Sequence, residues 1–266
     1  MSMGEIVIND DNYRDHLGPE GRGFSRGLVP RDYSAQPHGS LFFAKPFDLP
    51  LVNEADIPEM IREKQAKKTN LSDIRMKGMF GQMIPSRDQN GYGYCWCHGP
   101  TSAVLLCRAR DNQPFLDLSA FAIGCIIKNY RNQGGWGGDA VQFIAERGIP
   151  TSEFWPQKST SRSNDNPKTW ENAAKHEVTE WMDLDPRNME IQIATCLLNN
   201  IPLTAGLDWW SHEVCYADLV GWNPIRVKFW NSWTDSYGTN GMGELQGRKA
   251  IPSAALGLRV IKASAA

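Results

Sequence analysis

A glycine-broken loop that leads into a helix-like run is the feature that most restricts how this chain can fold. The loop, residues 89–96, is QNGYGYCW, and it continues directly into CHGPTSAVLL. A thiol at the first turn of a helix lies beside unpaired backbone N–H groups and the positive end of the helix dipole. Both favour the thiolate, which is the nucleophilic form of cysteine. The sequence therefore marks Cys95 as a candidate nucleophile, and Gln89 as a side-chain amide donor to the same reaction centre.

The same stretch resembles the signature of the papain-like cysteine peptidases, Gln-x-x-Cys-Gly-[Ser/Ala]-Cys-Trp. Gln89, Gly93, Cys95 and Trp96 match this signature in register. Tyr92 stands where the family has its first cysteine. Secreted members usually anchor a disulfide at that cysteine, so the resemblance implies that this bridge is absent here.

Two blocks in the C-terminal half follow in the family's order. HEVCYADLVGW begins at His212 and resembles the segment around the family's catalytic base, and FWNSW resembles its Asn-Ser-Trp motif. The resemblance implies that His212 is the base, that Asn231 accepts the other imidazole N–H, and that Trp233 shields this hydrogen bond from water. Gln89 and the backbone N–H of Cys95 would hold the oxyanion. Gln, Cys, His and Asn in the family's order are together far more specific than any one motif.

A glycine-rich strip, residues 132–140, lies between these blocks and reads NQGGWGGDA. Glycine lets an extended substrate backbone approach closely, and the family uses a Gly-Gly strip in this way. We therefore expect Gly134 and Gly135 to contact substrate, with Trp136 and Glu213 at the second subsite. There Glu213 would accept a basic or polar residue. A flexible turn and an exposed glutamate at a strand end are the alternatives.

The order of elements, helices first and strands later, predicts an α+β protein. The resemblance implies a two-lobed papain-like fold with a helical lobe, an antiparallel β-barrel-like lobe and an active-site cleft between them. The central helix should start near Cys95, but Pro100 lacks the N–H of a regular helix. Either the first turn is irregular or the helix begins near Gly99. Other helices are expected at about 56–68, 118–130, 140–147, 169–182 and 189–199, and strands at 201–207 and 256–261.

Residues 1–70 are expected to form an N-terminal extension, and residues 71–266 the papain-like catalytic domain. The start of the chain is rich in Gly, Pro, Asp and Arg without a sustained period, which is typical of an extended arm. Family members often carry an inhibitory prosegment, but its long-helix motif is not visible. A prosegment and an arm that wraps a lobe are both open interpretations.

Composition argues against several classes of partner. The formal net charge is −2, which gives no electrostatic grip on nucleic acid or an anionic membrane. No apolar run approaches membrane-spanning length, and the first residues lack the pattern of a secretory signal. We therefore expect a cytoplasmic or virion-associated protein whose six cysteines are free thiols. Assembly into a larger particle is left open.

We expect a cysteine-type peptidase that hydrolyses polypeptides through an acyl-enzyme on Cys95, with His212 as the base. The resemblance implies no metal and no organic cofactor. Cys97 is expected to be a packing residue, and His98 a local helix residue and not the base. Two alternatives stay open: a non-catalytic papain-fold module, such as a structural or virion component, and a cell-wall peptide hydrolase with the same chemistry.

Overall fold

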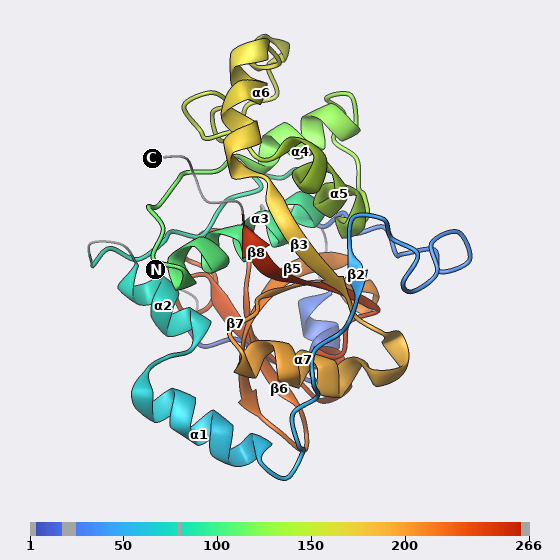
Figure 1. Cartoon of the computed structure of the whole chain (residues 1–266), viewed down its shortest axis with the longest axis vertical. Coiled ribbons are helices and arrows are strands. Elements are labelled where there is room, and N and C mark those ends of the chain that lie inside the picture. Colours follow the sequence, from blue (N-terminus) through green and yellow to red (C-terminus); the bar gives the residue numbers. More distant parts are fainter. Residues whose placement is uncertain (1–3, 18–24, 79–80, 262–266) are drawn as a thin grey trace.

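The computed structural model describes residues 4–17, 25–78 and 81–261, and it shows a mixed α+β protein (Figure 1). In Figure 1, α4, α5 and α6 lie above the central helix α3, and the sheet lies below it with α7 in front. The α-helices are α1 (Ile57–Lys67), α2 (Leu71–Lys77), α3 (Cys95–Arg110), α4 (Ala120–Ile127), α5 (Gly137–Arg147), α6 (Pro167–Ala173) and α7 (Met189–Leu198). Within the residues that the structure describes, no helix is long and apolar enough to cross a membrane.

The strands form one eight-stranded sheet in the order β1-β7-β6-β5-β4-β8-β3-β2. They are β1 (Val7–Ile8), β2 (Lys45–Pro46), β3 (Val178–Asp183), β4 (Leu203–Leu207), β5 (His212–Gly221), β6 (Arg226–Trp230), β7 (Met242–Gln246) and β8 (Ala254–Ile261). All neighbours from β7 to β3 are antiparallel, whereas β1 and β2 pair in parallel at the two edges. Among the described residues the sheet stays open instead of closing into the barrel-like lobe that was predicted. Two short strands from the N-terminal part of the chain occupy its edges.

The sheet separates two hydrophobic cores, and helix α3 lies in one of them. Every residue from Cys95 to Arg108 in this helix is buried. One core gathers apolar side chains of α3, α4 and α5. The other lies between the sheet and α7. Strand β5 is covered by α3 and by α7, and its residues 212–219 are all buried.

The central helix begins where the sequence predicts, and Pro100 lies inside it. The N–H of Cys97 donates to the carbonyl oxygen of Tyr94 at 2.9 Å, a three-residue bond that tightens the first turn. Because proline has no N–H, the carbonyl of Trp96 loses its usual helical donor. The alternative start near Gly99 is therefore wrong.

The helix predicted over residues 169–182 is wrong beyond its first half. Helix α6 ends at Ala173, and the chain continues as strand β3, which pairs antiparallel with β8. Pairing with β8 gives the backbone of this segment its hydrogen bonds, and Trp181 and Met182 are both buried. Tertiary contact thus overrides the local pattern. The other predicted helices and strands lie within about three residues of α1, α4, α5, α7, β4 and β8.

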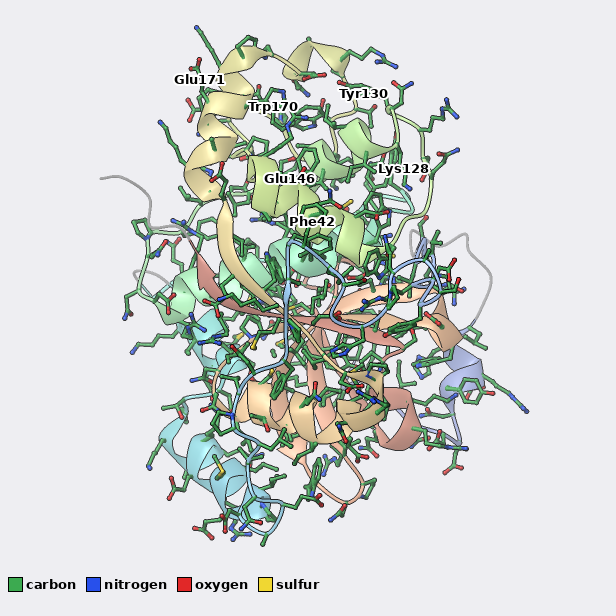
Figure 2. The ribbon with its side chains drawn as sticks, turned by 45° about the vertical axis from the view of Figure 1, so that its right-hand side comes forward. Phe42, Lys128, Tyr130, Glu146, Trp170 and Glu171 are labelled. Carbon is green, nitrogen blue, oxygen red and sulfur yellow. The ribbon has the colours of Figure 1, made fainter. Side chains whose placement is uncertain are left out.

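The N-terminal arm, defined here as residues 4–50 where described, is woven into the rest of the chain. Besides β1 and β2 it contributes Arg31, whose Nη1 and Nη2 donate to the two carboxylate oxygens of Asp183 at 2.6 and 3.0 Å. These side chains are 1% and 0% exposed. The N–H of Gly39 donates to the same carboxylate at 2.9 Å. Figure 2 shows Phe42 of the arm beside the helical lobe, and its side chain is 78% exposed.

Candidate active site

An imidazole held by an amide forms one half of the candidate site. His212 is the first residue of β5, and its Nε2–H donates to Asn231 Oδ1 at 2.8 Å. The ring of Trp233 stacks on this imidazole with 4.4 Å between centroids and 23° between planes. Nδ1 is buried and has no hydrogen-bond partner in the described part of the chain. With Nε2 engaged, the ring can take up a proton only at Nδ1.

A thiol at the start of α3 forms the other half. Cys95 is fully buried, and N–H groups of Glu213, Gly27 and Trp96 point at its sulfur. Glu213 directly follows His212, so the sulfur lies beside the start of β5. The thiol and the imidazole predicted from sequence are thus brought to the junction of α3 and β5.

The Gln89 side chain is fixed at both ends of its amide. Its Oε1 accepts a hydrogen bond from Ser232 Oγ at 2.6 Å. Its Nε2 donates at 2.6 Å to the carbonyl oxygen of Tyr92 and, at the same distance, to that of Ser25 in the arm. The amide N–H predicted to serve a substrate oxygen therefore contacts a carbonyl oxygen of the chain's own arm.

The predicted substrate-contacting glycines also face the arm. The N–H of Gly135 donates to Gly27 O at 2.9 Å, and Gly135 O accepts from Val29 N at 2.9 Å. Gly134 leaves room for the same backbone, because a Cβ atom at this position would lie 2.5 Å from Gly27 O. Both glycines thus permit a close backbone approach, and the arm makes it.

Trp136 and Glu213 line one pocket, and Leu28 of the arm forms part of the same wall. The Glu213 carboxyl accepts hydrogen bonds from Thr204 Oγ1 and from the N–H of Gly137. The carboxyl is buried, unlike the exposed glutamate that was the alternative. Its other oxygen has no partner among the described residues.

Burial keeps the reacting groups uncharged in this arrangement. It raises the pKa of the Cys95 thiol to about 12, against the opposing effect of the N–H groups of Glu213 and Gly27. It lowers the pKa of His212 to about 3, although the hydrogen bond to Asn231 acts in the other direction. Burial also raises the pKa of the Glu213 carboxyl to about 8. The thiol and imidazole are therefore neutral here, whereas the sequence predicted that the helix start would favour the Cys95 thiolate.

A second thiol and a second imidazole, those of Cys97 and His98, also lie on α3, but both side chains are buried in the core. Cys97 is fully buried, and burial raises its pKa well above the ordinary value. His98 is buried edge-on against Phe121, with 5.7 Å between ring centroids. Within the described ranges both of its ring nitrogens lack hydrogen-bond partners.

Sequence reasoning missed two parts of this site. Ser232 lies inside the Asn-Ser-Trp motif, and its proximity to Asn231 could have drawn attention to it. The arm residues 25–29 carry no signal of their own, because their composition is that of an ordinary loop.

A family model and a curated relative both match this chain. The family model described as papain family cysteine protease matches residues 69–251. Zingipain-1 of Zingiber officinale is 27% identical over 130 residues, which are 48% of this chain and 57% of that protein. The chain thus covers little more than half the length of this relative.

Solved structures share the fold. Xylellain, a cysteine protease from Xylella fastidiosa, has a TM-score of 0.61 at 14% identity, covering 89% of this chain and 96% of its own. Digestive procathepsin L 3 of the Tenebrio molitor larval midgut has a TM-score of 0.50 at 15% identity, covering 77% and 88%. The family match extends over more than half of the sequence, and the chain therefore belongs to the papain family of cysteine proteases.

Proposed function

We propose that this protein is a cysteine peptidase that hydrolyses peptide bonds through an acyl-enzyme on Cys95. The observation that carries the proposal is the hydrogen bond from His212 Nε2 to Asn231 Oδ1 at 2.8 Å. This bond leaves Nδ1 as the ring's proton acceptor. The next residue, Glu213, directs its backbone N–H at the Cys95 sulfur, so the imidazole belongs to the residue adjacent to this contact. An oriented base beside a thiol at a helix N-terminus is the arrangement that nucleophilic catalysis requires.

The chemistry follows from these positions. His212 Nδ1 takes the proton of the Cys95 thiol, and the sulfur attacks the carbonyl carbon of the scissile peptide bond. The developing oxyanion receives N–H bonds from the Gln89 amide and from the Cys95 backbone, and loss of one such donor costs about 100- to 1000-fold in rate. The imidazolium then gives its proton to the leaving amine. Water hydrolyses the resulting thioester and frees the enzyme.

Substrate contacts belong to the same proposal. Gly135 would offer its N–H and C=O to an extended substrate backbone, with Gly134 leaving room for it. A substrate side chain would enter the pocket between Trp136 and Glu213. The partnerless Glu213 oxygen in the described structure supports a preference for a basic or polar residue there. Equal cleavage of fluorogenic peptides with arginine and with leucine at this position would contradict that preference.

Paired substitutions test the catalytic assignment. Cys95→Ala should abolish hydrolysis of casein and of a fluorogenic peptide, whereas Cys97→Ala on the same helix should retain it. His212→Ala should likewise abolish hydrolysis, with His98→Ala as its matched control. Unchanged hydrolysis by Cys95→Ala, with folding verified by circular dichroism, would refute the proposal.

A second candidate is a non-catalytic papain-fold module, and the filled site favours it. Labelling by an epoxysuccinyl inhibitor such as E-64 discriminates between the two, because it needs an accessible and reactive Cys95. Activity on a peptidoglycan zymogram without activity on protein would instead indicate a cell-wall peptide hydrolase.

A further inference from the structure

We propose that residues 25–29, here called the strap, hold the site closed as a permanent part of the fold, and that the site opens by displacement of the strap without any cut in the chain. This inference rests on the proposed function, because it concerns the regulation of that same site. It is argued from the strap's contacts in the cleft and from its anchors on either side.

The strap occupies the backbone positions that an extended peptide would use. It pairs with Gly135 in parallel, through Val29 N to Gly135 O and Gly135 N to Gly27 O, both at 2.9 Å. The N–H of Leu28 also donates to the carbonyl oxygen of Ser211 at 3.0 Å. Peptides are commonly bound by such main-chain pairing, so the strap and a substrate exclude each other.

The strap also engages the reacting groups. The carbonyl oxygen of Ser25 accepts hydrogen bonds from Gln89 Nε2 at 2.6 Å and from Trp233 Nε1 at 3.3 Å. The N–H of Gly27 points at the Cys95 sulfur. The proposed oxyanion donor and the proposed nucleophile are therefore both covered by the strap.

One buried side chain fixes the strap. Leu28 is 7% exposed and lines a pocket together with Trp136 and Glu213, whereas the next residue, Val29, is 49% exposed. The backbone at Gly27 lies so close to Gly93 that a Cβ atom would collide with the Gly93 carbonyl oxygen. The strap therefore depends on one buried leucine and one glycine.

Anchors on both sides tie the strap to the domain. On the C-terminal side lies Arg31, whose ion pair with Asp183 is almost fully excluded from solvent. On the N-terminal side β1 pairs with β7, and Ile8 is fully buried. The carbonyl oxygen of His16 accepts the Trp210 indole N–H at 3.1 Å. Because both flanks are held, the strap can leave the cleft and return as an intramolecular competitor at high effective concentration.

Alkylation of Cys95 measures opening directly. Intact protein is treated with iodoacetamide at pH 8, and modification of Cys95 is followed by peptide mapping. When labelling occurs only from the open state, its rate is proportional to the open fraction. Leu28→Ala removes three buried carbon atoms from the closed strap, and at about 0.8 kcal/mol for each the rate should rise about 60-fold. Phe42→Ala, an exposed arm residue outside the cleft, should leave the rate within about twofold of wild type.

Two further readouts keep the test decisive. Gly27→Ala should also raise the rate, because its methyl group cannot fit against Gly93. With a fluorogenic peptide, Leu28→Ala should lower the apparent KM and leave kcat nearly unchanged, since the strap competes with substrate. The intact mass must stay that of the full chain throughout.

Equal labelling of wild type, Leu28→Ala and Gly27→Ala would overturn the inference, as would labelling confined to molecules that have lost their N-terminal residues. Failure of the proposed function looks different. Faster labelling of Cys95 in the two strap variants without any peptide hydrolysis would support the strap and contradict the peptidase.

Discussion

The buried ion pair between Arg31 and Asp183 offers a measurable test of the arm as part of the folded domain. Replacing Arg31 with methionine keeps the length of the side chain but leaves the Asp183 carboxylate without its guanidinium. The Gly39 N–H, at 2.9 Å, would remain as one of its donors. The main-chain oxygens of Gln36 and Pro37, which accept from Arg31 at 3.0 and 2.9 Å, would lose their donor as well.

The expected cost follows from burial. The two side chains are 1% and 0% exposed, so solvent screening gives little relief. Removing one partner of a buried pair costs about 3–5 kcal/mol. At about 2–4 °C per kcal/mol for a chain of this size, the unfolding midpoint of Arg31→Met should fall by roughly 6–20 °C.

Thermal unfolding followed by circular dichroism measures this change. Arg62→Met is the matched control, because its ion pair with Glu59 is 66% exposed on both sides and such pairs contribute about 0–1 kcal/mol. The double variant Arg31→Met with Asp183→Leu should recover much of the loss, since no unpaired charge stays buried. A midpoint for Arg31→Met no lower than that of Arg62→Met would refute the reasoning and leave the arm a loosely attached segment.

Two further substitutions test the site itself. Ser232→Ala removes the 2.6 Å hydrogen bond that orients the Gln89 amide. A neutral hydrogen bond of this kind contributes about 0.5–1.5 kcal/mol. The kcat/KM for peptide hydrolysis should therefore fall about 2- to 12-fold, with the unfolding midpoint little changed. Burial, with a smaller effect of Asp139, raises the pKa of Glu213 from 4.5 to about 8. Strap closure buries the protonated carboxyl. Closure is therefore fully favoured below pH 4.5 and weakens as the pH rises to about 8. The iodoacetamide labelling rate of Cys95, corrected for thiolate content, should rise across this window in wild type and stay flat in Glu213→Gln; a rise of the same size in both would contradict the linkage.

The sequence carries much of the fold because its strongest signals are local. The turn around Gly93, the thiol at a helix start and the Asn-Ser-Trp motif depend on residues close together in the chain. The central helix survives Pro100 because the proline lies in its first two turns, where only the Trp96 carbonyl loses a donor. The order of these blocks then identifies the papain-like arrangement.

The remaining features depend on contacts between distant residues. Strand β3 has a sequence that also suits a helix, and its pairing with β8 and β2 decides its structure. The strap contacts Gln89, which lies 64 positions from Ser25 in the sequence, and Gly135, which lies more than 100 positions from Gly27. No local sequence pattern predicts contacts over such separations. The neutral state of Cys95 follows from the same long-range burial, so sequence alone could not predict it.

The most direct test of the central claim is to trap the covalent intermediate. The strap variant Leu28→Ala is mixed with a p-nitrophenyl ester of a short peptide, quenched in acid within milliseconds to seconds, and mapped by mass spectrometry. The account predicts an acyl group on the peptide that contains Cys95, attached to that sulfur, and no adduct when Cys95 is also replaced by alanine. Turnover of the ester without a covalent adduct, or with the acyl group on Cys97 instead, would contradict it.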